Sequence, residues 1–161
     1  HGKNGRRALR NHRTCAGNGA GAPGALKRRP SEAITTFLFA HTLEKEIAGL
    51  LRQHLAIAAE LLTALRDGDE QAAAGARTRW FQNADNIARF LGTINPFWSE
   101  AEWRTMLHEH LRLLGNEIAF RLEGDYVQNV AVSDEIERQA LAMADMMTDG
   151  IARQFPSLFM P

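Results

Sequence analysis

The sequence predicts an all-α protein: an antiparallel up-down four-helix bundle made of two repeated helical hairpins, with a short extra N-terminal helix. Apolar residues recur at helical spacing in four segments, and no segment shows sustained alternation typical of a strand. One stretch is also written twice, since residues 53–55 (Gln-His-Leu) return as residues 109–111 (Glu-His-Leu), and an Asp-Gly-Asp or Gly-Asp turn follows each copy at the same distance. A repeated unit of this kind cannot bury its apolar face alone and needs a partner.

Charge and composition divide the chain into a basic tail, residues 1–30, and a helical bundle domain, residues 31–161. The tail is rich in Gly, Arg and Ala and poor in large apolar residues, so we expect it to be disordered. Residues 1–31 hold eight basic and no acidic side chains, whereas the remainder holds eleven basic and nineteen acidic ones, a net charge of about −8. This acidic bundle argues against nucleic-acid binding.

The cysteine count and the hydropathy indicate the compartment. Cys15 is the only cysteine of the sequence, which fits a reducing, cytoplasmic location. No apolar run approaches the length of a membrane span, so we expect no membrane partner.

The first hairpin begins after the tail. Pro30-Ser31-Glu32 opens a short helix that runs to about residue 43, and a long helix follows over residues 44–66. Gly68 suits a left-handed helix end, and Asp69 suits the N-cap of a second helix over residues 70–91. The apolar positions of the long helix fall on one arc, predicted to be core: Leu50, Leu51, Ile57, Ala58, Leu61, Leu62 and Leu65.

The second hairpin follows a corner at Asn95-Pro96, where Trp98 and Trp103 are predicted to pack the second helix against the third. Ser99 with Glu102 is a capping pattern and starts the third helix, which ends at residues 123–125. A fourth helix runs over residues 126–154, with Ser133 predicted to mark an irregularity, and Pro156 ends it.

Two histidines are predicted to point inward at equivalent places of the two hairpins. On the helical wheels His54 and His110 both lie within apolar arcs, and Glu117 follows His110 two turns later on the same face. Imidazole and carboxylate groups from facing helices can hold Fe, Zn, Mn or Cu in a bundle core. Glu137, at the edge of the fourth helix's apolar face, and Asp85, from the second helix, could add carboxylates to this metal site.

The alternative is a pair of core histidines whose ring nitrogens bond Glu117, a backbone carbonyl or each other. Neither the Glu-x-x-His signature of di-iron bundles nor a His-Glu-x-x-His zinc motif is present. His108 points away from His110 on the wheel and is predicted to be solvated, as is Asp145. No nucleophile-base-orienter set appears, which favours a non-enzymatic protein.

Several motifs resemble a little-studied family of small bacterial proteins built from repeated helical hairpins. They lie between about residues 48 and 159: residues 79–91 (RWFQNADNIARFL), 95–99 (NPFWS), 106–111 (MLHEHL), 134–137 (DEIE), 143–147 (MADMM) and 150–156 (GIARQFP). Members of that family are sometimes labelled acetylglutamate kinase or glycosyltransferase, but such enzymes need α/β folds for which this sequence has no signal. Members of the resembling family look as if they carry one more helical hairpin, which stands before the segment that matches the first hairpin of this chain and has its own histidine.

The sequence therefore leaves two functions open. The first is a non-enzymatic helical-bundle protein that self-associates as a homo-oligomer, because the absent hairpin would leave an apolar groove to be filled by the short N-terminal helix or by a second subunit. The second is a metal-binding bundle protein with a transition metal as its cofactor, held by His54, His110 and Glu117.

Overall fold

The described part of the chain, residues 30–159 of a computed structural model with side chains from residue 39 onward, is helical throughout apart from its turns. No strand occurs within these residues, which confirms the all-α prediction. Between residues 30 and 159, none of the helices is long and apolar enough to cross a membrane. Of the predicted disordered tail, residues 1–29 lie outside the described residues and Pro30 already belongs to the first helix.

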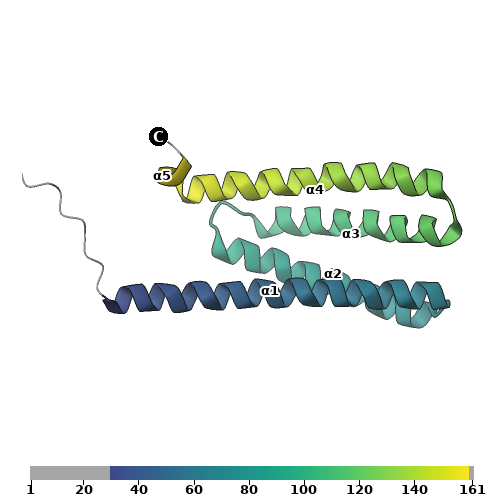
Figure 1. Ribbon diagram of the computed structural model, residues 1–161, viewed down its shortest axis with the longest axis horizontal. Helices are drawn as coiled ribbons and strands as arrows, with labels where there is room; N and C mark the ends of the chain where they lie inside the picture. The colour runs from purple at the N-terminus through teal and green to yellow at the C-terminus, as the bar shows by residue number, and fades with distance from the viewer. Residues whose placement is uncertain (1–29, 160–161) are drawn as a thin grey trace, which may run out of the picture.

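Four long helices form an up-down bundle in which each helix runs antiparallel to the one before it (Figure 1). One short helical turn follows the fourth helix and begins at Pro156. The sequence analysis predicted that Pro156 ends the fourth helix, but it did not predict this turn. The elements are α1 (Pro30–Asp67), α2 (Glu70–Ile94), α3 (Glu100–Glu123), α4 (Tyr126–Gln154) and α5 (Pro156–Phe159).

The two hairpin turns end and restart helices as the sequence predicts. Gly68 and Gly124 adopt φ angles of 73° and 78°, the left-handed region that glycine enters at least cost. Asp69 and Asp125 then accept hydrogen bonds from the backbone N–H three residues on, which satisfies a free donor of α2 and of α4. Ser133 causes no break, because α4 is continuous and the Ser133 hydroxyl bonds the Glu117 carboxylate of α3.

The main core cluster lies between α1 and α2, with one leucine inserted from α3. Several of its residues are alanines, which let the backbones of the first hairpin approach closely. The cluster consists of Ile57, Leu61, Ala64, Ala73, Ala76, Trp80, Ala84 and Leu111.

A second cluster surrounds the corner between α2 and α3. The indoles of Trp98 and Trp103 meet edge to face with their centroids 5.9 Å apart, and both pack against the end of α2, as predicted. Trp98 also donates from Nε1 to the Met146 carbonyl of α4 at 3.2 Å. Gly150 of α4 leaves room for this indole, because a Cβ there would overlap it.

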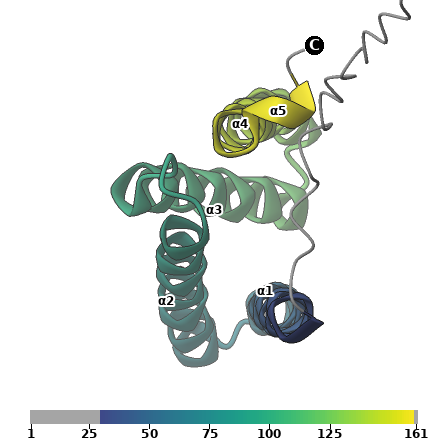
Figure 2. The ribbon, with the colours of Figure 1, turned by 90° about the vertical axis from the view of Figure 1, so that its left-hand side faces the viewer.

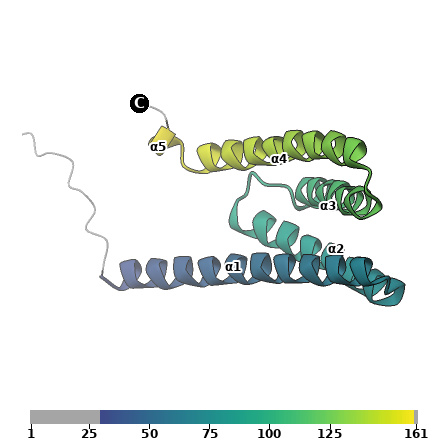
Figure 3. The same ribbon diagram turned by 45° about the vertical axis from the view of Figure 1, so that its right-hand side comes forward.

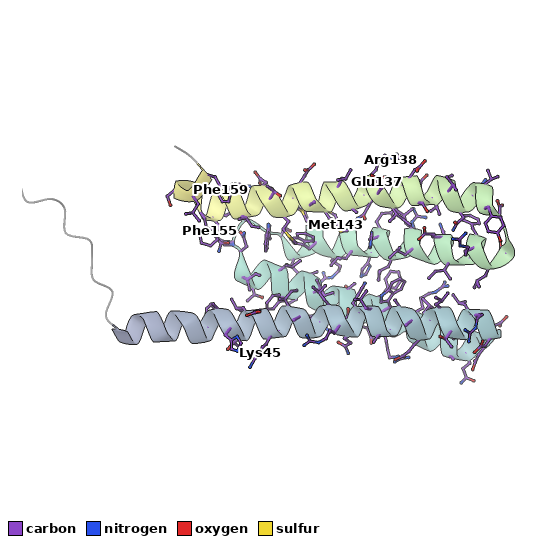
Figure 4. All side chains as sticks on the ribbon, viewed as in Figure 1. Lys45, Glu137, Arg138, Met143, Phe155 and Phe159 are labelled. Carbon is purple, nitrogen blue, oxygen red and sulfur yellow. The ribbon has the colours of Figure 1, made fainter. Side chains whose placement is uncertain are left out.

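The helices pack in chain order, α1 on α2, α2 on α3 and α3 on α4. Consequently α1 and α4 are the outer helices and lie on opposite sides of the molecule in the three ribbon views (Figures 1, 2 and 3). Met143 lies on the side of α4 that faces α3, whereas Lys45 projects from the outer side of α1 (Figure 4).

Two predictions for the first helix are wrong. The segment expected as a separate short helix is the first part of α1, so it extends that helix instead of folding back over it. In addition, Leu51 and Leu62 are not core residues: with Leu55 they form an exposed row on α1, which we call the leucine row. A helical wheel of α1 shows that Leu51 and Leu62 lie on a face with other apolar residues, but it does not show whether another helix covers that face.

Candidate functional site

His54 of α1 is held by Asn83 of α2. The distance from His54 Nδ1 to Asn83 Oδ1 is 2.7 Å. The amide nitrogen of Asn83 donates to the Leu50 carbonyl at 3.2 Å and to Gln53 Oε1 at 3.1 Å. Asn83 is 2% exposed, so this small side chain links three groups of α1 from a buried position on α2.

His110 of α3 is held in the same way by Gln139 of α4. The distance from His110 Nδ1 to Gln139 Oε1 is 2.7 Å, and the amide nitrogen of Gln139 donates to the Met106 carbonyl at 2.8 Å. In both hairpins the amide residue follows its histidine by 29 positions. In both, it also bonds the carbonyl one turn before that histidine. We call the two arrangements the histidine–amide clasps.

The clasps determine the tautomer of each histidine. A backbone carbonyl can only accept a hydrogen bond, so each amide turns its nitrogen toward the carbonyl and its oxygen toward the ring. The ring must then donate from Nδ1–H, which leaves Nε2 of both His54 and His110 with an unprotonated lone pair in the neutral form.

Burial lowers the pKa of His54 below its ordinary value of 6.5. The hydrogen bond with Asn83 raises the pKa, and the charge of a protonated His110 lowers it again. His54 is therefore neutral at pH 7, the form in which imidazole binds metals.

Trp80 of α2 covers one side of the His54 ring, with the ring centroids 5.4 Å apart and the planes tilted by 38°. Trp80 is 2% exposed and belongs to the main core cluster. Its Nε1 lacks a hydrogen-bond partner among the described residues, as does Nε1 of Trp103. His54 is thus fixed by a hydrogen bond at one ring nitrogen and by apolar packing on a ring face.

The carboxylates predicted to complete a metal site do not join the two histidines. Glu117 accepts the hydrogen bond of Ser133. Glu137 is exposed on α4, the outer helix on the opposite side of the molecule from α1 (Figure 4), and His54 belongs to α1. Asp85 bonds Arg104 and His108 instead. Within the described residues, no three His, Cys, Asp or Glu side chains gather closely enough to hold a metal ion.

His108, which was predicted to be solvated, is only partly exposed, because it also contacts the neighbouring helix α2. His108 Nε2 lies 2.8 Å from Asp85 Oδ1, and the ring meets Phe81 edge to face at 4.9 Å. Arg104 Nε donates to the same Asp85 oxygen at 3.1 Å. Since these side chains are between a third and a half exposed, the cluster contributes little to stability. Asp145 is exposed, as expected.

The residues that sequence reasoning missed are Asn83 and Gln139, which satisfy the histidines in place of Glu117, a carbonyl or each other. The sequence repeat could have identified Asn83 and Gln139, because each of these amide residues follows the inward histidine of its hairpin by 29 positions. What the site offers chemically is two imidazole side chains, each held in one orientation and one tautomer. A comparison of the chain with family models, curated proteins and solved structures gives no match.

Proposed function

We propose that this protein is a non-enzymatic helical-bundle protein that acts as a homo-oligomer, and that copies meet at the leucine row of α1. The observation that carries the proposal is the exposure of this row: Leu51, Leu55 and Leu62 are 48%, 70% and 45% exposed. Three leucines within four turns on one helix face form a contiguous apolar strip, a feature of interaction surfaces.

The corresponding face of α3 indicates how such a row is used. In the sequence repeat, Leu55 corresponds to Leu111, and Leu51 corresponds to Leu107. Leu111 is 1% exposed and Leu107 is half-buried, because both pack against the hairpin of α1 and α2. A hairpin covers the row on α3, whereas no described element covers the row on α1.

The exposed apolar residues on the outer face of α4 are less suited to self-association. Val127, Val130 and Leu141 lie on the exposed face of α4, but Asp134 and Asp145 interrupt that face. Burying unpaired carboxylates opposes association. The uncharged leucine row on α1 is therefore preferred over this face of α4.

The proposal also includes a non-enzymatic role, a cytoplasmic location and membership of a family. Ser99 is occupied as the N-cap of α3 and Ser133 donates to Glu117, so neither hydroxyl is paired with a histidine base, which supports a non-enzymatic protein. We place the protein in the cytoplasm, which its one cysteine supports. Membership of the bacterial repeated-hairpin family is supported by the motifs that resemble it.

Sedimentation equilibrium over a wide concentration range tests this function. The native chain has a mass of 17.9 kDa and should sediment as a multiple of it, whereas Leu55→Glu should shift the protein to the single-chain mass. Val127→Glu, an equally drastic change at a residue 78% exposed on α4, is the matched control and should leave the mass unchanged. A native protein with the single-chain mass at every concentration would overturn the proposal.

A second candidate function is metal binding by the two clasped histidines. It is favoured by the bare Nε2 of both His54 and His110, because metal-binding histidines usually donate their other ring N–H to a fixed acceptor. Two imidazoles suit Zn or Cu best, with Fe as a further choice, and Mn prefers oxygen ligands. Water or an added ligand would have to complete the coordination.

Elemental analysis of protein purified without chelator, followed by titration with Zn²⁺ and Cu²⁺, tests this candidate. Metal binding near one ion per chain should be lost in His54→Ala and in His110→Ala. His108→Ala is the matched control, because the Nε2 of His108 already bonds Asp85. Protein without bound metal whose melting temperature is unmoved by either ion would eliminate the candidate.

A further inference from the structure

The leucine row has a defined arrangement of small, large and charged residues around it. Successive residues of an α-helix turn by about 100°, so Ala48 and Ala59 fall on the same side of α1 as the leucines. Glu44 stands before this apolar stretch and Arg66 stands after it, on the same side. Both charged side chains are more than half exposed. The face is therefore apolar in its middle, acidic at its N-terminal end and basic at its C-terminal end.

This arrangement is symmetric about Leu55. Leu55 lies midway between Glu44 and Arg66, and it also lies midway between Ala48 and Leu62 and between Leu51 and Ala59. A face of this kind is complementary to itself when a second copy lies antiparallel to the first. A twofold axis at Leu55 brings each residue before Leu55 against the residue that stands equally far after Leu55 in the other copy.

We infer that two copies of the protein pair through an antiparallel α1–α1 seam centred on Leu55. The inference rests on the proposed function and specifies its interface. Leu55 faces Leu55 of the other copy at the twofold axis. On either side of the axis, a leucine faces an alanine: Leu51 faces Ala59, and Leu62 faces Ala48. Large residues thus meet small ones, which allows close packing of two helices.

The charges select the antiparallel direction. In this register Glu44 of each copy lies opposite Arg66 of the other, so two ion pairs close the ends of the apolar strip. With a rise of about 1.5 Å per residue, the two pairs stand about 33 Å apart along the helix axis. A parallel seam would set Glu44 against Glu44 and Arg66 against Arg66, and like charges directly opposite each other disfavour it.

The present partners of these charges can be exchanged at little cost. Glu44 lies 3.5 Å from His41, and Arg66 bonds the adjacent Asp67 at 2.8 Å. Both pairs are exposed, where an ion pair contributes little because water and salt screen it. A second copy can therefore draw Glu44 and Arg66 into the seam without breaking a buried contact.

Disulfide trapping in a Cys15→Ser background tests the register. Leu55→Cys should give a covalent dimer rapidly under mild oxidation, because the twofold axis places position 55 against itself. Leu62→Cys should link far more slowly, since position 62 faces Ala48, and the double variant Leu62→Cys/Ala48→Cys should again link rapidly. Circular dichroism would verify that each variant keeps its helices.

Charge reversal tests the direction by an independent route. Glu44→Arg and Arg66→Glu should each raise the dimer dissociation constant about tenfold, and the double variant should restore it because the two charges have exchanged places. Arg52→Glu, on the same helix but to the side of the seam, is the control.

The outcomes separate the inference from the proposed function. A dimer that does not cross-link through Leu55→Cys, or that links equally well through Leu55→Cys and Leu62→Cys, overturns the antiparallel seam and leaves self-association standing. A double charge variant that dissociates even more easily than either single variant also overturns it. A protein that is monomeric at every concentration overturns both.

Discussion

Removal of the Asn83 side chain should cost more stability than any other amide truncation in the described bundle. Asn83→Ala deletes the acceptor of His54 Nδ1–H and the donor to Leu50 and Gln53. The Leu50 carbonyl keeps its helical hydrogen bond and Gln53 is exposed to water, so the main loss is the stranded ring N–H of His54. An unsatisfied buried donor costs about 1–3 kcal/mol, and the small cavity adds to this, giving about 2–3 kcal/mol.

The expected shift in melting temperature is large enough to measure. For a chain of this size, about 1 kcal/mol corresponds to about 2–4 °C, so Asn83→Ala should melt about 5–10 °C lower. Gln139→Ala should cost about half as much, since Gln139 is half-buried and makes two of these bonds. Gln82→Ala, at an exposed neighbour on α2, should change stability by less than about 0.5 kcal/mol.

Urea denaturation followed by circular dichroism gives the free energies, and ¹⁵N NMR of the imidazole gives the tautomer. Wild-type His54 should carry its proton on Nδ1, and Asn83→Ala should allow the Nε2–H tautomer to appear. If Asn83→Ala were as stable as Gln82→Ala and kept the Nδ1–H tautomer, the clasp would not be what holds His54.

Two further predictions follow from burial and packing. Burial lowers the pKa of His54 below its unfolded value of 6.5, so the unfolded chain takes up its proton first and the free energy of unfolding should fall as the pH drops through about 6.5 toward the folded pKa. His54→Gln should flatten this slope in denaturation series between about pH 7.5 and about pH 5.5, and an unchanged slope would contradict the burial. Gly150→Ala should destabilise by about 1–3 kcal/mol and shift the tryptophan fluorescence, because the new Cβ overlaps the Trp98 indole. Gly115→Ala, with open space around it, should be neutral or stabilising, and equal effects of the two substitutions would refute the packing argument.

Local chemistry made the helices and their ends predictable. Gly68 and Gly124 are the residues that enter the left-handed region most easily, and Asp69 and Asp125 cap the next helices through bonds that span three residues. The inward position of His54 was likewise visible on a single helical wheel, because it depends only on the turn per residue.

The partners of the histidines and the uncovered helix face were not predictable in this way. Whether Asn83 or Glu117 reaches a histidine depends on how far one helix slides along another, and no wheel of a single helix contains that register. Similarly, Leu51 and Leu62 are apolar like any core residue, and only the packing order of the helices reveals that nothing in the described chain covers them.

Intermolecular contacts of the Leu55 methyl groups test the central claim most directly. In a mixture of methyl-labelled and unlabelled protein, an isotope-filtered NOE experiment detects only contacts between copies. Leu55 should show cross-peaks to Leu55 and to the neighbouring Leu51 of the other copy. Intermolecular cross-peaks from Val127 or Val130 of α4, with none from Leu55, would contradict the assignment of the leucine row of α1 as the surface where two copies meet.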